Sequence, residues 1–264
     1  MERAIQDYID YLHNVRKVSY NTELSYERDI RKAAEYFKEH NIDKPEEITE
    51  VNMNSYMLWL ECENMSAATV SRRIASLRSF FAFLISNGSA VSDPTRMLKL
   101  PKVQRKTPEI LSKYDIERLL EQPDSHTVKG IRDRAMLELL CATGIRVSEL
   151  VGLGIQDVDI KRGCIVCHGE KSDRWIRFSD RADKALALYL EHARDILLKG
   201  GESTYLFVNC SGAGMSRQGF WKLLKKYAKD ADINRDITPQ LLRQTFAVQC
   251  LFEGKTVDFS GFTC

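Results

Sequence analysis

An apolar helical run that stops at a glycine is the feature that most constrains how this chain of 264 residues folds. Between residues 131 and 140 the apolar side chains recur at the spacing of a helix packed along one side: Ile131, Ala135, Met136, Leu139 and Leu140. Gly144 follows where a left-handed helix cap belongs, and a second helix is predicted to begin at Val147. Arg146 is therefore expected at a junction between two rigid helices, where its planar fork of donors suits a phosphate. The competing interpretation for this arginine is a helix cap or an ion pair with Glu149.

The basic residues gather in one stretch of an otherwise neutral chain. The 39 Lys and Arg residues nearly balance the 37 Asp and Glu residues, but between Asn64 and Pro108 the only acid is Asp93. The same stretch contains these basic residues: Arg72, Arg73, Arg78, Arg96, Lys99, Lys102, Arg105 and Lys106. A local basic stretch predicts a polyanionic partner, and double-stranded DNA is the one we expect. A solvated helix face followed by a charged linker is the alternative.

The cysteines and the apolar runs predict a reduced, cytoplasmic protein. The seven cysteines are odd in number and lack the spacing of a disulfide scaffold. Cys164 and Cys167 have the spacing of a metal-binding pair, but they lie in a strand-like run without a second pair, so no metal site is predicted. No segment resembles a signal peptide or reaches membrane-spanning length, so no membrane partner is expected.

The pattern of helices and strands predicts a mainly α fold with two domains. The first domain, residues 1–100, is expected to contain four helices, at residues 2–15, 24–40, 51–61 and 66–86. Residues 101–108 hold two prolines and several basic residues, as an extended linker would. The second domain, residues 109–264, is expected to be α+β. Its predicted strands, at residues 156–160, 163–167 and 174–178, form a small antiparallel sheet among helices at 114–121, 182–198 and 217–229.

Two groups of basic residues are candidates for DNA contact. Arg72, Arg73 and Arg78 are predicted on the face of helix 66–86 opposite its apolar residues, where they could lie against a DNA backbone. The linker contributes Lys102, Arg105 and Lys106, which could cross a groove while the two domains hold the duplex.

Two segments of the second domain together resemble the tyrosine recombinase family, most closely its Xer-type members. Residues 142–150 read ATGIRVSEL, and residues 237–247 read ITPQLLRQTFA. The resemblance extends to the basic linker and the helical first domain. It implies a SAM-like core-binding domain, a catalytic domain, and assembly of identical or related subunits into a tetramer on DNA. In this family two arginines and a lysine surround the scissile phosphate, and a tyrosine attacks it to form a phosphotyrosyl bond without any cofactor.

The resemblance implies roles for individual residues. Arg146 and Arg243 would be the two arginines, which stabilise the charge that develops on the phosphate. Gln240 stands where the family usually has a histidine before the second arginine, and Gln244 stands where a histidine commonly follows it. Glutamine donates hydrogen bonds but does not transfer protons. The lysine belongs to the turn between the second and third strands. Lys171 fits if one residue is deleted, whereas counting back from Arg174 without a gap leads to His168 or Gly169.

No residue of the sequence matches the family's nucleophile. The last tyrosine, Tyr227, precedes Arg243 and is expected to be packed in the core. Beyond Gly254 the sequence departs from the family, which suggests a truncated catalytic domain. Three hypotheses follow: a recombinase by descent that is inactive as this chain, a non-catalytic DNA-binding protein that occupies recombination sites, and a helical interaction module. The paired arginine motifs disfavour the third.

Overall fold

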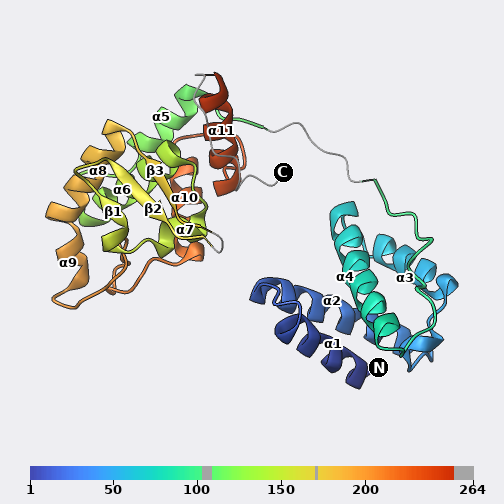
Figure 1. Cartoon of the computed structure of the whole chain (residues 1–264). Helices are drawn as coiled ribbons and strands as arrows, with labels where there is room; N and C mark the ends of the chain where they lie inside the picture. The colour runs from blue at the N-terminus through green and yellow to red at the C-terminus, as the bar shows by residue number, and fades with distance from the viewer. Residues whose placement is uncertain (103–108, 170–171, 253–264) are drawn as a thin grey trace. The chain divides into compact units, whose positions relative to one another are not determined.

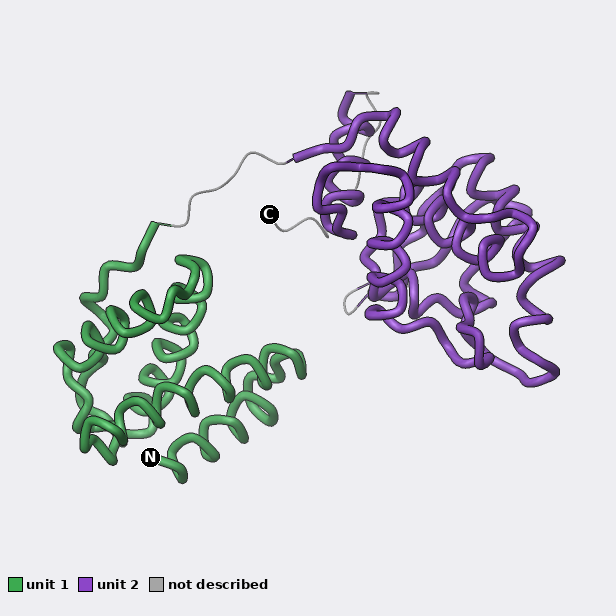
Figure 2. The backbone as a smooth tube through the Cα atoms, turned by 180° about the vertical axis from the view of Figure 1, so that it is seen from behind, with its two compact units in different colours: residues 1–106 green, residues 107–264 purple. Residues whose placement is uncertain are grey.

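The computed structural model describes residues 1–102, 109–169 and 172–252, and Figure 1 shows its elements. The chain divides into two compact units, Met1–Lys106 and Thr107–Cys264 (Figure 2). None of the helices in the described ranges has both the length and the apolarity that crossing a membrane requires.

The first unit contains four α-helices around an apolar core. They are α1 (Glu2–Asn14), α2 (Tyr20–Glu39), α3 (Glu50–Cys62) and α4 (Ala67–Ser86), with the short 3₁₀ helix η1 (Pro45–Glu47) before α3. The hydroxyls of Ser19, Thr49 and Ser66 cap three of these helices by accepting an N–H three residues ahead. Because Ser19 is a cap, α2 begins earlier than residue 24, where the sequence predicted it. The core is rich in large side chains, among them Tyr8, Phe37, Tyr56, Phe80 and Phe81.

The second unit combines helices with a small sheet, as predicted. Its helices are α5 (Lys113–Glu121), α6 (Val128–Thr143), α7 (Val147–Gly152), α8 (Asp180–His192), α9 (Arg194–Leu198), α10 (Arg217–Asp230) and α11 (Pro239–Phe252). The antiparallel strands β1 (Val158–Asp159), β2 (Cys164–Cys167) and β3 (Arg174–Arg177) lie side by side in the order β1-β2-β3 (Figure 1). Ile165 of β2 pairs with Val158 on one side and Ile176 on the other.

Two predicted elements of the second unit also differ clearly from the structure. The first strand is shorter than expected, because the 3₁₀ helix η2 (Ile155–Asp157) occupies the start of the predicted range. The predicted helix 182–198 is interrupted at Ala193, whose φ of −123° departs from helical geometry. Directly after this break, the buried guanidinium of Arg194 donates hydrogen bonds to three carbonyl oxygens: those of Ser203, Tyr205 and Leu206. The interruption thus accompanies a long-range contact that local periodicity does not encode.

Helix α6 lies at the centre of the second unit and ends at a glycine that has two roles. Its apolar residues from Ala135 to Leu140 are fully buried, and it packs against α8 and α11. Gly144 ends the helix with a φ of 60°, which confirms the predicted left-handed cap. A Cβ atom at Gly144 would lie 2.2 Å from the Phe246 ring of α11. The glycine therefore both ends α6 and allows α11 to approach it closely.

Candidate active site

The two arginines singled out from the sequence meet at one carboxylate, that of Glu149. Arg146 directly precedes α7, and its backbone N–H donates to Glu149 Oε2 at 2.6 Å. Its Nη1 donates to Glu149 Oε1 at 3.3 Å. Arg243, on α11, places its Nη1 4.0 Å from Glu149 Oε2. A third guanidinium, that of Arg174 at the start of β3, donates to Glu149 Oε1.

Local sequence explains how each arginine reaches this point. The left-handed Gly144 turns the chain out of α6, so that Arg146 begins α7 with extended backbone, at a ψ of 150°. Thr238 caps α11 by accepting the N–H of Leu241, and Pro239 occupies the first turn, where no N–H is needed. Within α11, Thr245 on the buried side accepts the N–H of Leu111, which fixes the helix to the start of the unit.

The burial of these groups differs, and so does their electrostatic setting. Arg243 is 5% exposed, whereas the Arg146 side chain is 45% exposed. Burial lowers the pKa of Arg243, and the positive charge of Arg146 lowers it further, while Glu149 opposes the effect. Among these four side chains, three cations face one anion. An added phosphate oxygen would therefore find fixed donors and a local excess of positive charge.

The ion pair between Arg146 and Glu149 matches the competing interpretation of Arg146, but that interpretation does not explain the rest of the cluster. If Arg146 were only a helix cap, there would be no reason for the buried Arg243 of α11 and the half-buried Arg174 of β3 to contact the same carboxylate. The close packing of Phe246 on Gly144 also brings the two sequence motifs into direct contact. The structure thus joins the two motifs that the sequence analysis paired only by resemblance.

The structure describes only some of the other residues that are expected around the phosphate. Gln240 lies three residues before Arg243 on α11, and its side chain is exposed. Gln244 is half-buried on the same helix. Lys171 lies outside the described residues. His168, which directly follows β2, contacts the carboxylates of Asp157 and Asp173.

Tyr227 is packed, as expected from its position in the sequence. It is 6% exposed on α10, and its hydroxyl donates to Asp133 Oδ2 at 2.8 Å. Asp133 is itself buried and paired with Arg132. Burial and the neighbouring Asp133 carboxylate raise the pKa of the Tyr227 hydroxyl. This tyrosine therefore has a structural hydrogen bond and is poorly suited to act as a nucleophile.

The basic face predicted on α4 is smaller than expected. Arg72 is exposed and forms an ion pair with Asp29 of α2. Arg73 is only 7% exposed and lies 3.9 Å from the same carboxylate. Arg78 is half-buried and donates to the carbonyl oxygens of Thr95 and Leu98. The prediction that Arg73 lies on an exposed face is therefore wrong.

The physical reason is a buried carboxylate that the sequence analysis did not weigh. Asp29 is 2% exposed and lies among the core residues of α2, so a nearby cation offsets the cost of its burial. Arg73 has the helical spacing of Ile74 and Leu77 on the core side of α4, and it adds a second positive charge beside Asp29, to which Arg72 donates a hydrogen bond. The signal in the sequence was an aspartate directly before the apolar Ile30. Of the linker candidates, Lys102 is exposed, and Arg105 and Lys106 lie outside the described residues.

Sequence reasoning also missed the positions of Arg174 and Glu149 at the centre of the site. Arg174 served only as a reference point for counting back to the lysine, and Glu149 entered only as a competing partner of Arg146. The half-buried side chain of Arg174, with exposed Trp175 next to it, follows strand alternation. Strand alternation was therefore the available signal for an inward-pointing arginine.

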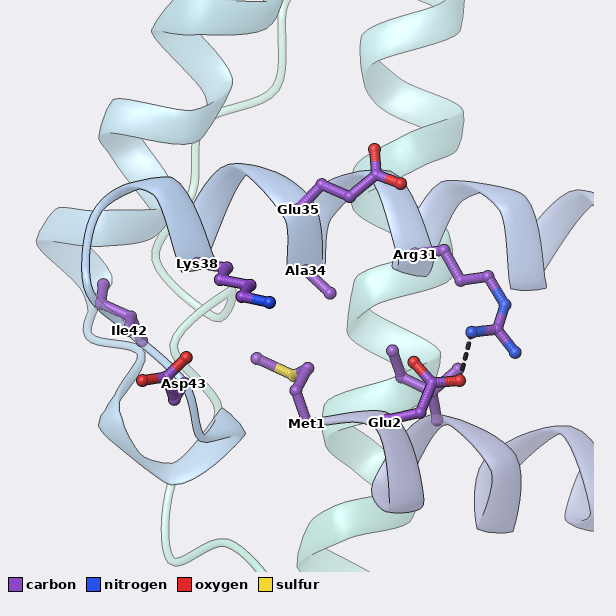
Figure 3. Close-up of a pocket in the computed structure, with 9 residues that line it drawn as sticks. Met1, Glu2, Arg31, Ala34, Glu35, Lys38, Ile42 and Asp43 are labelled. Carbon is purple, nitrogen blue, oxygen red and sulfur yellow. Dashed lines mark hydrogen bonds and ion pairs between the residues drawn. The ribbon is translucent and has the colours of Figure 1, made fainter.

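A separate hollow in the first unit has a different character. It lies between α1, α2 and the segment that follows α2, and Figure 3 shows the ion pair of Arg31 with Glu2 at its rim. The lining mixes both charges with apolar side chains: Met1, Glu2, Ile5, Arg31, Ala34, Glu35, Lys38, Ile42 and Asp43. Because three acids face two bases, this hollow lacks the excess positive charge that a phosphate requires.

Comparisons with known proteins agree with this geometry. The model of the Phage integrase family matches residues 109–259, and the model of the phage integrase N-terminal SAM-like domain matches residues 5–88. The tyrosine recombinase XerD of Oceanobacillus iheyensis is 39% identical over 257 residues, which cover 96% of this chain and 86% of that protein. The tyrosine recombinase XerC of Roseiflexus sp. (strain RS-1) is 36% identical over 258 residues, which cover 96% and 82%.

Solved structures support the fold. The XerH site-specific recombinase bound to its difH substrate has a TM-score of 0.71 and 18% identity to this chain. The match covers 96% of this chain and 75% of that one. At this level of identity the likeness concerns the fold alone.

Proposed function

Because this chain belongs to the phage integrase family, whose relatives include the tyrosine recombinases XerC and XerD, we propose that it acts on double-stranded DNA at a site-specific recombination site. In this proposal Arg146 and Arg243 hold the phosphate at which strands are exchanged. Residues 109–264 form the catalytic domain, residues 1–100 form the core-binding domain, and residues 101–108 link them. Several subunits, identical or related, would assemble on the DNA.

The observation that carries the proposal is the convergence of Arg146 and Arg243 on Glu149. Two guanidinium groups fixed by different helices hold their positions before the phosphate arrives, so little reorganisation is needed during the reaction. Their donors can follow the charge that develops on the phosphate oxygens in the transition state. Lys171 is the proposed third cation of this site.

A finer part of the proposal concerns the strand-cleavage step. The sequence contains no tyrosine between residues 228 and 264, and the Tyr227 hydroxyl is held by Asp133. In addition, Gln240 and Gln244 replace groups that could transfer a proton. We therefore expect the polypeptide of these 264 residues to bind DNA without forming the phosphotyrosyl bond on its own. The same observations favour the second candidate function, a non-catalytic DNA-binding protein that occupies recombination sites.

DNA contacts outside the phosphate site would come from exposed basic residues. Arg72 and Lys102 are exposed in the structure, and Arg105 and Lys106 are proposed from the sequence. Arg73 and Arg78 are engaged with Asp29 and with backbone carbonyls, so we assign them a supporting role in the first unit.

The test compares two exposed arginines that each pair with an acid three residues away in the chain, one inside the arginine cluster and one outside it. Arg146 pairs with Glu149 three residues ahead at 3.3 Å, and Arg162 pairs with Asp159 three residues behind at 3.5 Å. We expect Arg146→Gln to weaken binding to duplex DNA about tenfold, because a charge-assisted hydrogen bond to the phosphate is lost. Arg162→Gln should change the affinity less than about twofold. Equal effects of the two substitutions would contradict the assigned role of Arg146.

Two further measurements separate the parts of the proposal. DNA affinity should fall steeply as salt is raised, because phosphate contacts release counterions. Incubation with a nicked duplex followed by a denaturing gel should give no covalent protein–DNA product. A covalent product would refute the proposed inability to cleave, and affinity that does not respond to salt would refute DNA binding through phosphate contacts.

A further inference from the structure

His168 makes an unusual pair of contacts for a side chain that is 62% exposed. It directly follows β2, and its Nε2 lies 3.0 Å from Asp157 Oδ1 of η2. Its Nδ1 lies 3.0 Å from Asp173 Oδ1, in the residue that precedes β3. One imidazole ring thus bridges two carboxylates that lie on either side of β2 in the chain.

The bridge requires a particular protonation state. A neutral imidazole has one N–H donor and one acceptor nitrogen, whereas an ionised carboxylate only accepts. Both contacts can therefore be hydrogen bonds only when the ring is an imidazolium with two N–H groups. In the neutral ring, one nitrogen lone pair would face a carboxylate oxygen, and that contact would be lost.

The two carboxylates are not equivalent. Asp157 is buried, and its Oδ2 accepts the backbone N–H of Gly154 at 2.7 Å, so this carboxylate is fixed in place. Asp173 is 54% exposed and belongs to the chain entering β3. The bridge therefore ties an exposed partner, Asp173, to a fixed anchor, Asp157, and Asp173 is the contact that we expect to open first.

The position of Asp173 connects this bridge to the arginine cluster. The last paired residues of β2 and β3 are Cys167 and Arg174, so His168 and Asp173 stand just beyond the end of the ladder. Arg174 donates to Glu149, which also contacts Arg146 and Arg243. A displacement at Asp173 would reach Glu149 through Arg174, its immediate neighbour.

We propose that His168 is a pH-dependent positioning residue: as an imidazolium it fastens the start of β3 to η2 and so holds Arg174 on Glu149. The neutral form releases Asp173, which loosens the link between β3 and the arginine cluster. The consequence for DNA rests on the proposed function, but the bridge itself does not.

The direction of the pH dependence follows from the same contacts. The hydrogen bond to Asp157 raises the pKa of His168, and the hydrogen bond and charge of Asp173 raise it further. Glu149 of α7 lines the same hollow as His168 and adds negative charge nearby. Because the folded-state pKa is raised, the bridge stabilises the fold fully below the ordinary value near 6.5. That stabilisation is lost as the pH rises through the folded-state value.

The first test is a titration of the histidine ring signals by NMR. We expect His168 to titrate above the ordinary value, and we expect Asp157→Asn and Asp173→Asn each to lower its pKa. His192 is the matched control, since it is also 62% exposed and lies near only one carboxylate, at 3.7 Å, among the described contacts. An ordinary pKa for His168, or one that neither substitution moves, would overturn the proposal.

The second test measures hydrogen exchange of the β3 amides from about pH 5 to about pH 8, corrected for the intrinsic rate. In the wild type, protection of the Arg174 to Arg177 amides should fall about twofold or more across this range. His168→Gln should give the weakly protected state at every pH, and His168→Arg, a permanent cation, should keep the protected state. His192→Gln should behave as the wild type.

Protection that does not depend on pH in the wild type, or that is equal in the wild type and His168→Gln, would refute the positioning role. A merely structural role of His168 would lower protection in the variants but give no pH profile. Both tests use the protein without DNA, so their failure is distinct from a failure of DNA binding.

Discussion

Substitution of Gly144 by alanine tests whether the two sequence motifs really depend on one close contact. The substitution imposes two separate costs. The backbone φ of 60° is left-handed, which costs an alanine about 1–2 kcal/mol. The new Cβ would also lie 2.2 Å from the Phe246 ring, and forced overpacking of this kind costs about 1–3 kcal/mol. Together we expect a loss of about 2–5 kcal/mol in the free energy of unfolding of the second unit.

The chain provides a control that separates the two costs. Gly163 also has a left-handed φ, of 62°, but nothing lies within 4 Å of a Cβ built there. Gly163→Ala should therefore cost only the backbone term, about 1–2 kcal/mol. The difference between the two alanine variants measures the contact between Gly144 and Phe246. In the Gly144→Ala background, Phe246→Ala should cost much less than it does alone, since it removes the clash.

The assay is urea unfolding followed by tryptophan fluorescence. Trp175 and Trp221 lie in the second unit and Trp59 in the first, so a Trp59→Phe background makes the signal specific to the second unit. Equal losses for Gly144→Ala and Gly163→Ala would refute the reasoning, and so would additive effects of Gly144→Ala and Phe246→Ala. Because Arg243 and Phe246 share α11, the Gly144 variant should also weaken DNA binding, whereas the Gly163 variant should not.

Two further outcomes follow from burial. Arg73→Ala should destabilise the first unit by about 3–5 kcal/mol, since it removes a buried side chain and leaves the buried carboxylate of Asp29 with one cation fewer. Arg72→Ala should cost less, because the Arg72 side chain is half exposed although it donates a hydrogen bond to the same carboxylate; urea unfolding compares the two variants, and a larger cost for Arg72→Ala would contradict the burial argument. Burial raises the pKa of the Cys141 thiol to about 12, so iodoacetamide near neutral pH should modify the exposed Cys62 and Cys210 first. Mass spectrometry follows the order of labelling, and modification of Cys141 before Cys62 and Cys210 would contradict this expectation.

The features that the sequence predicted well are those encoded over a few residues. The helix predicted at residues 66–86 begins with Ser66, which caps it by accepting the backbone N–H of Thr69, and the helix predicted to begin at Val147 does so. Gly144 was recognisable as a left-handed cap for the same reason. Such features depend on one side chain and the next three backbone groups, so a single sequence contains them completely.

The features that the sequence did not predict depend on distant partners. Arginine is usually a surface residue, and only the buried Asp29 on another helix explains why Arg73 is buried. The interruption at Ala193 similarly depends on carbonyl oxygens ten or so residues further along the chain, which receive the Arg194 guanidinium. The meeting of Arg146 and Arg243 was anticipated only through a family resemblance, because helical periodicity does not say which helices pack together.

The arginine cluster shows why these long-range contacts matter for function. Burial is the main cause of the lowered pKa of Arg243, and the positive charge of Arg146 lowers it further, so the two guanidinium groups repel each other. Glu149 of α7 supplies an anion between the two groups. The close packing of Phe246 on Gly144 fixes how near α11, which carries Arg243, lies to the end of α6. The carboxylate therefore keeps the pair assembled in the absence of DNA, and a phosphate that enters the cluster meets donors already in place. Because three guanidinium groups share that one carboxylate, the cluster keeps an excess of positive charge that a phosphate could neutralise.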